Sequence, residues 1–75
     1  MPKRPVVSGE AALRAFELLG FRIAHSHGSH VVVRKDTPDG AHGTTVPMHD
    51  EIARGTLASM LRQAQVDPED FFRNI

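Results

Sequence analysis

The sequence predicts an α+β fold in which two helices cover one face of a three-stranded antiparallel sheet. Three observations lead to this prediction: apolar residues recur at helical spacing near both ends of the chain, β-branched or alternating segments lie between them, and short turns rich in glycine or proline separate those segments. The predicted order is α-β-β-β-α with a short helical turn at the C-terminal end, packed in two layers. The other face of the sheet is expected to be free.

The first helix is predicted to begin after Ser8. A serine there can cap unpaired N–H groups, Glu10 suits the positive end of the helix dipole, and Val7 can pack against Ala12. Apolar side chains then recur at helical spacing at Ala12, Phe16 and Leu19. Gly20 is expected to end the helix, because glycine adopts the left-handed conformation at low cost.

Three strands are predicted to follow. The first begins at Phe21, and a reversal at residues 28–29 leads into a β-branched second strand over residues 30–34. Residues 36–40 are predicted to form a turn, because they combine aspartate, proline and glycine. Residues 43–47 are predicted as a third, shorter strand that the proline ends.

The C-terminal part of the chain predicts a helix and a final helical turn. Thr56 is expected to cap the helix, whose apolar stripe consists of Leu57, Met60, Leu61 and Ala64. Asp67 is expected to cap the last turn, with Pro68 at its first position and Val66 packed against Phe71.

The length of 75 residues predicts one domain, over residues 1–75, with residues 1–7 as a mobile arm and not a signal peptide. The chain has no cysteine, which agrees with a reducing cytoplasm, and it has no apolar segment of the length that a membrane helix needs. Nine basic and nine acidic residues give a formal net charge of zero, which argues against a strong overall attraction to nucleic acid. Residues 21–35, however, contain cations and no carboxylate. One surface is therefore expected to be locally positive.

The segment HSHGSH places three imidazoles within residues 25–30, where a metal site, a catalytic base and a plain turn are all chemically possible. His25 and His27 lie on the same side of a strand and, with a third imidazole nearby, have the donor atoms for zinc or nickel. Cysteines are absent and the spacing is not that of a zinc finger, so no native metal site is predicted. The alternatives for this pair are solvated strand residues or partial phosphate contacts. His42 and His49 are expected in loops, as ordinary exposed or hydrogen-bonded residues. The alternative for His49 is that it lies beside the sheet and helps to shape the site.

A series of short motifs runs along nearly the whole chain: Ser8-Gly9, Leu19-Gly20-Phe21, Gly28-Ser29-His30, Pro38-Asp39-Gly40, Thr45-Val46-Pro47, His49, Gly55-Thr56-Leu57 and Leu61-Arg62-Gln63-Ala64. In this order and spacing they resemble the HicA family of toxin mRNA interferases, small proteins with a double-stranded-RNA-binding-domain-like fold. The chain departs from the family pattern at Gln65, where relatives carry glycine after Gln-Ala. If the backbone is left-handed there, a residue other than glycine is expected to destabilise the fold by roughly 1 kcal/mol.

The resemblance implies the toxin of a type II toxin–antitoxin system, an endoribonuclease that cleaves mRNA and is inhibited by a HicB-type antitoxin. The family's catalytic histidine is the one in Gly-Ser-His, which is His30 here. RNA supplies the 2′-hydroxyl nucleophile, so a base, cations and alignment are enough and neither a metal nor another cofactor is expected. His30 is the expected base, and the expected RNA contacts are Arg22, His27, Ser29, Arg34 and Lys35, with Arg34 or Lys35 holding the phosphate.

Two other functions are compatible with the predicted fold. One is a module that binds duplex RNA without cleaving it, and the other is a protein that only docks a partner. The face of the sheet on which His30 lies is also open. Alternation groups it with Val32 and Arg34, but a run of three valines does not say which set is buried, and a bulge at residues 28–29 would change the parity.

Overall fold

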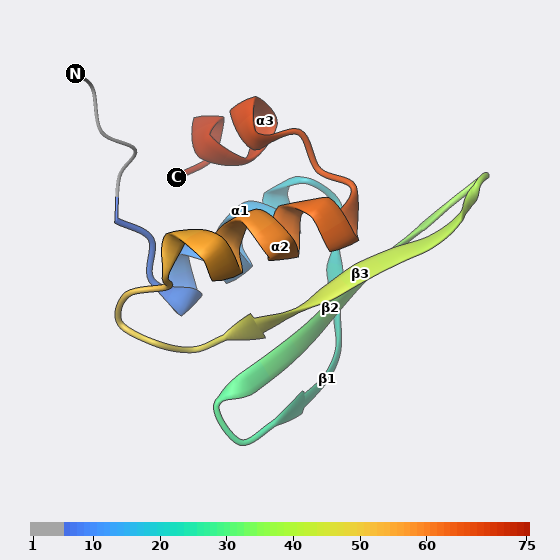
Figure 1. Cartoon of the computed structure of the whole chain (residues 1–75). Coiled ribbons are helices and arrows are strands. Elements are labelled where there is room, and N and C mark those ends of the chain that lie inside the picture. The colour runs from blue at the N-terminus through green and yellow to red at the C-terminus, as the bar shows by residue number, and fades with distance from the viewer. Residues whose placement is uncertain (1–5) are drawn as a thin grey trace.

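The computed structural model describes residues 6–75 of the chain. In chain order its elements are α1 (Gly9–Leu18), β1 (Arg22–His27), β2 (His30–Thr37), β3 (Gly40–Pro47), α2 (Arg54–Ala64) and α3 (Pro68–Arg73). The predicted fold class and order are confirmed, and the predicted C-terminal turn is the six-residue α3. Figure 1 shows the helices on one side of the sheet, while the far end of the β2–β3 hairpin extends beyond them.

The sheet is an antiparallel meander in the order β1-β2-β3, so β2 is the central strand. The prediction of a short third strand is wrong, because β3 begins at Gly40 and matches β2 in length. The predicted turn shrinks to Pro38 and Asp39. Thr37 Oγ1 donates a 2.7 Å hydrogen bond to the Gly40 carbonyl, and Gly40 closes the reversal with φ of 124°.

The first strand starts one residue later than predicted. Phe21 is packed in the core, and its N–H donates to the Phe16 carbonyl at 2.9 Å, so this residue closes the C-terminal end of α1 from the connecting segment. Strand β1 then begins at Arg22, and its pairing with β2 shifts between Ile23 and His25. Such a bulge bends an edge strand and increases its twist.

The burial of two valines places His30 on the open face of the sheet. Val31 and Val33 are 9% and 0% exposed and face the helices. Because side chains alternate along a strand, His30 and Arg34 lie on the opposite face. The irregularity of the sheet lies in β1, so the reversal at residues 28–29 does not change this parity.

The core lies between the sheet and the helices. Phe16 is fully buried, with its ring centre 5.2 Å from that of Phe21 and 5.4 Å from that of Phe71. These contacts attach α3 to α1 and contribute packing energy beyond the area buried. The predicted apolar stripe of α2 is buried as expected: Leu57, Met60, Leu61 and Ala64.

Two of the three predicted helix caps are confirmed. Ser8 Oγ accepts the Ala11 N–H at 3.1 Å, and Asp67 Oδ1 accepts the Glu69 N–H at 2.8 Å. Each bond satisfies a backbone donor that the helix itself leaves unpaired. The start of these two helices is therefore determined locally by the sequence.

The prediction that Thr56 caps the second helix is wrong. Helix α2 begins at Arg54, after Ala53, which has no side chain able to cap. The Ile52 N–H donates to the Val7 carbonyl at 2.8 Å, and Ile52 is buried. This long-range attachment, rather than a capping side chain, positions the first turn of α2.

The packed domain begins earlier than the predicted arm allows. Val7 is 1% exposed and belongs to the core, whereas Val6 is exposed. Residues 1–5 of the predicted arm lie outside the described residues. No helix within residues 6–75 has both the length and the apolar character needed to cross a membrane.

Candidate functional site

His30 is the first residue of β2 and follows the tight Gly28–Ser29 reversal. Gly28 has φ of 60°, a left-handed conformation that glycine adopts without strain. In the ladder, His30 pairs with His27 on one side and with Pro47 on the other. Its imidazole is exposed and forms no hydrogen bond or ion pair within residues 6–75. The backbone is therefore fixed while the ring nitrogens stay free for a ligand.

Two backbone hydrogen bonds attach the segment after β3 to this end of the sheet. The Met48 N–H donates to the Ser29 carbonyl at 2.6 Å, and the Gly9 N–H donates to the His49 carbonyl at 2.8 Å. A Cβ at Gly9 would lie 2.5 Å from Met48 Cα, so only glycine permits this close approach. The result is that the His49 ring lies beside the His30 ring, with 6.5 Å between their centres.

A shallow hollow of about 580 Å³ lies where β3 meets α2, and His30 and His49 both line it. Thr44 Oγ1 donates a 2.8 Å hydrogen bond to Gln63 Oε1 and ties the two elements together at the hollow. The other polar lining residues are Thr45, Glu51, Thr56 and Ser59. Hydroxyls and imidazoles of this kind are able to bind a phosphodiester and to transfer protons.

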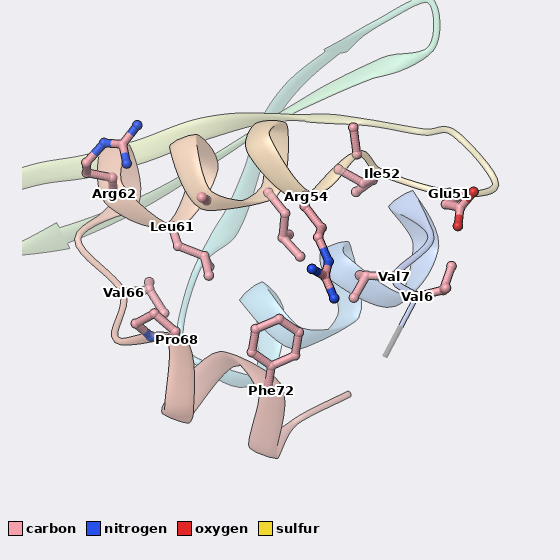
Figure 2. A pocket seen from close by; sticks show the side chains of 13 residues that line it. Val6, Val7, Glu51, Ile52, Arg54, Leu61, Arg62, Val66, Pro68 and Phe72 are labelled. Carbon is pink, nitrogen blue, oxygen red and sulfur yellow. The ribbon is translucent and has the colours of Figure 1, made fainter. Parts of the chain in front are cut away.

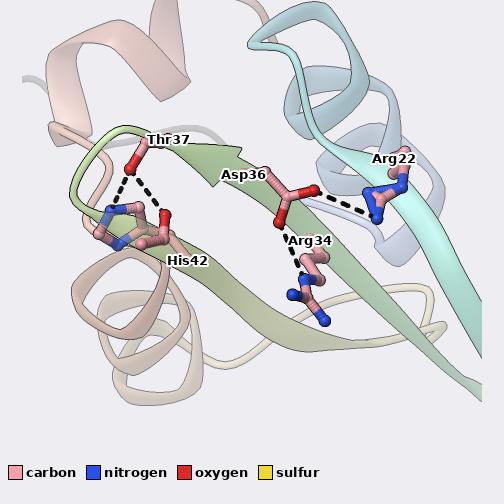
Figure 3. A network of polar contacts seen from close by, with 6 residues as sticks. Arg22, Arg34, Asp36, Thr37 and His42 are labelled. Atoms are coloured by element: carbon pink, nitrogen blue, oxygen red, sulfur yellow. Dashed lines mark hydrogen bonds and ion pairs between the residues drawn. The ribbon is translucent and has the colours of Figure 1, made fainter.

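Asp36 pairs with two of the predicted RNA contacts on the open face (Figure 3). Arg22 Nη2 lies 3.4 Å from Asp36 Oδ2, and Arg34 Nε lies 3.2 Å from Asp36 Oδ1. These side chains are between 52% and 61% exposed, so each ion pair is weak. The positive charge predicted for this surface is present but is partly offset by one carboxylate.

The amino-acid sequence matches the family model described as "HicA toxin of bacterial toxin-antitoxin" over residues 9–66. The match includes α1, the whole sheet and α2, and therefore most of the chain. The chain belongs to the HicA toxin family. Curated proteins compared with the sequence give no match. The helix α3 lies outside the range matched to HicA, although Phe71 makes it part of the same core.

One predicted RNA contact of this HicA domain lies apart from the others. Lys35 has the same strand parity as the buried Val33, so it faces the helices. Its Nζ donates to the Leu19 carbonyl at 2.9 Å and lies 5.8 Å from the centre of the Phe21 ring. The structure brings Arg22, His27 and Arg34 to the face of His30, but not Lys35.

The other two histidines of this HicA domain have different surroundings. The prediction that His42 lies in a loop is wrong, because β3 begins at Gly40 and His42 pairs with Lys35 in the ladder. Its Nε2 lies 3.0 Å from Thr37 Oγ1 (Figure 3), which agrees with the prediction of a hydrogen-bonded residue. His25 pairs with Val32 in the ladder and is exposed on the open face. Within residues 6–75, no three histidine, cysteine or carboxylate side chains come close enough to hold a metal ion.

A larger hollow of about 1060 Å³ lies between α2, α3 and the segment before α1 of the HicA domain (Figure 2). Its lining is mainly apolar and includes Val7, Ile52, Leu57, Leu61, Val66 and Phe72. Among the residues that the structure describes, the charged side chains of the lining are those of Glu51, Arg54 and Arg62. None of the described residues that line this hollow is a histidine, so the imidazoles of the domain lie elsewhere.

From the sequence, two alternatives were open for His49: an ordinary exposed or hydrogen-bonded loop residue, or a residue beside the sheet that helps to shape the site. A loop residue has no predictable position, and the backbone of His49 is held beside the sheet by long-range hydrogen bonds at Met48 and Gly9. The available signal is its distance along the chain from Pro47, two residues earlier, which pairs with His30 in the ladder.

Proposed function

We propose that this HicA family toxin is an endoribonuclease that cleaves mRNA without a metal ion and uses His30 as its general base. The observation that supports the proposal is the imidazole of His30, which lines a polar hollow and has no hydrogen-bond partner among the described residues. The backbone of this residue is fixed at the start of the central strand. Groups held on strands keep the geometry that catalysis needs better than groups on mobile loops. Because the proposed substrate is mRNA, we propose that the protein acts in the cytoplasm.

In the proposed reaction, His30 takes the proton of a 2′-hydroxyl, whose oxygen then attacks the adjacent phosphorus. A positioned base contributes on the order of 10²- to 10⁴-fold to such a step. Arg34 and Arg22 lie on the same face as His30 but roughly 13 Å farther along the sheet, so their proposed role is to bind phosphates of flanking nucleotides. His27, just before the reversal, and Ser29, within it, are exposed and complete the proposed RNA-binding surface.

The experiment that tests this function compares the purified protein with its His30→Ala variant on a single-stranded RNA, with chelator present. A DNA oligonucleotide of the same sequence serves as substrate control, and His42→Gln serves as protein control because His42 lies outside the hollow. We expect cleavage of RNA alone, unchanged by chelator and by His42→Gln, and reduced at least about 100-fold by His30→Ala. RNA that is bound but left intact by the folded wild type would instead indicate a binding module.

A toxin–antitoxin family implies a partner that silences the toxin, and we propose a HicB-type antitoxin that covers the open face and His30. Carboxylates on such a partner would meet Arg22, Arg34 and the exposed histidines. The test is the rate at which diethyl pyrocarbonate modifies His30, measured by mass spectrometry with and without the bound antitoxin. We expect protection of His30 in the complex. An unchanged rate at His30 in a saturated complex would contradict direct masking.

A further inference from the structure

We infer that His49 is the general acid of the same reaction, so that cleavage uses a pair of histidines with opposite roles. The inference rests on the proposed function, in which His30 is the base. It adds a second catalytic residue that touches the reacting phosphodiester on the side of the leaving group.

With one histidine as base and the other as acid, each proton transferred and each bond formed or broken in the reaction is accounted for. His30 accepts the proton of the 2′-hydroxyl, and the new bond joins the 2′-oxygen to phosphorus. The bond from phosphorus to the 5′-oxygen breaks, and the leaving oxygen takes a proton from the His49 imidazolium. The products are a 2′,3′-cyclic phosphate and a 5′-hydroxyl. An alkoxide is a poor leaving group, so its protonation in the transition state accelerates the step on which cleavage depends.

The geometry of the pair suits this division of labour. The ring centres are 6.5 Å apart and the ring planes are inclined by 68°, so the rings are neighbours without stacking face to face. Neither imidazole has a hydrogen bond or ion pair within residues 6–75, so the ring nitrogens of both are free. Each nitrogen must reach one oxygen of a phosphodiester at about 2.6 to 3.2 Å, from opposite sides of the phosphorus. The two rings line one hollow, and the 6.5 Å between their centres leaves room for a phosphodiester that contacts both.

The position of His49 is held by elements outside the strand that carries His30. The Gly9 N–H, in α1, donates a hydrogen bond to the His49 carbonyl. The Met48 N–H donates a hydrogen bond to the carbonyl of Ser29, in the reversal before β2. Both bonds use backbone atoms, so a substitution of the imidazole leaves the attachment in place. A rigid attachment of this kind is what proton transfer in a fixed geometry requires.

The other histidines are poorer candidates for the acid. His27 pairs with His30 across the ladder but forms no ring contact with it, and it does not line the hollow. His25 lies farther along β1, opposite Val32. His42 is hydrogen-bonded to Thr37 and is also absent from the hollow. Only His49 shares both a ring contact and the hollow with His30 among the described residues.

The test uses two versions of one RNA that contain a single cleavable linkage. In the first version the leaving atom is the natural 5′-oxygen, and in the second it is a bridging 5′-sulfur. A thiol has a pKa of about 8.5, so a thiolate leaves without a proton and makes a general acid unnecessary. The proteins compared are the wild type, His49→Gln, His30→Gln and the control His42→Gln. Thermal unfolding of each variant verifies that it is folded.

We expect His49→Gln to cleave the oxygen substrate on the order of 100-fold more slowly than the wild type and the sulfur substrate within a few-fold of it. His30→Gln should be slow on both substrates, because the 2′-hydroxyl still needs a base. An equal loss on both substrates in His49→Gln, or no loss on either, would overturn the role of His49 while leaving His30 as the base. Failure of the wild type to cleave either RNA would overturn the proposed function and this inference together.

Discussion

The N–H of Gly9, at the first position of α1, donates a 2.8 Å hydrogen bond to the carbonyl of His49. This bond joins the start of the first helix to the segment that follows the last strand. It lies next to the Met48 to Ser29 hydrogen bond, which continues the connection to the reversal before His30. The position of the two imidazoles therefore depends on a glycine that itself takes no part in chemistry.

Replacement of Gly9 by alanine is expected to destabilise the fold by about 1 to 3 kcal/mol and to reduce RNA cleavage. The added Cβ would lie 2.5 Å from both Met48 Cα and the Pro47 carbonyl oxygen, so backbone must move. Urea denaturation measures the change in stability. The matched control is Gly55→Ala in α2, where a Cβ meets nothing within 4 Å and where stability should be unchanged or slightly raised. Equal effects of the two substitutions would contradict the assigned role of Gly9.

Replacement of Gln65 by glycine is expected to stabilise the domain by roughly 1 kcal/mol. Gln65 ends α2 with φ of 56° and ψ of 44°, a left-handed conformation in which a Cβ is strained. The control is Ala58→Gly, at an exposed right-handed position inside the same helix, where glycine should cost about 1 kcal/mol. Thermal unfolding of both variants checks the opposite signs. A destabilised Gln65→Gly variant would show that the glutamine side chain makes a contact outweighing the strain.

Replacement of Asp36 by asparagine is expected to tighten RNA binding roughly two- to five-fold at low salt, because Arg22 and Arg34 lose their shared carboxylate. Fluorescence anisotropy measures the affinity, with His30→Ala in the background to prevent cleavage. Asp39→Asn makes the same change in net charge at the tip of the β2–β3 hairpin, where the aspartate has no ion pair with a described residue. A gain of equal size in both variants would mean that overall charge, and not the release of the arginines, controls binding.

The helices were the most predictable part of the structure, because their signals are local. The α2 stripe of Leu57, Met60, Leu61 and Ala64 is buried at the predicted spacing. Ser8 and Asp67 cap as predicted, since a capping bond needs only neighbouring residues. Thr56 failed as a cap because the start of α2 depends on a long-range bond between Ile52 and Val7.

The faces of the sheet were not predictable, because three consecutive valines in β2 fit either parity. Once Val31 and Val33 are known to be buried, His30 and Arg34 must lie on the open face and Lys35 must lie with the helices. The separation of Lys35 from the other cations follows from packing and not from any local motif. The position of the His49 backbone likewise follows from tertiary hydrogen bonds.

The most direct test of the proposed chemistry is the identity of the ends produced when the wild-type protein cleaves a defined single-stranded RNA in the presence of chelator. Mass spectrometry of the fragments identifies the phosphate at the cut. Activation of the 2′-hydroxyl by His30 predicts a 2′,3′-cyclic phosphate on one fragment and a 5′-hydroxyl on the other, with both products lost in His30→Ala. Fragments with a 3′-hydroxyl and a 5′-phosphate would show that water attacks instead, and would contradict the account.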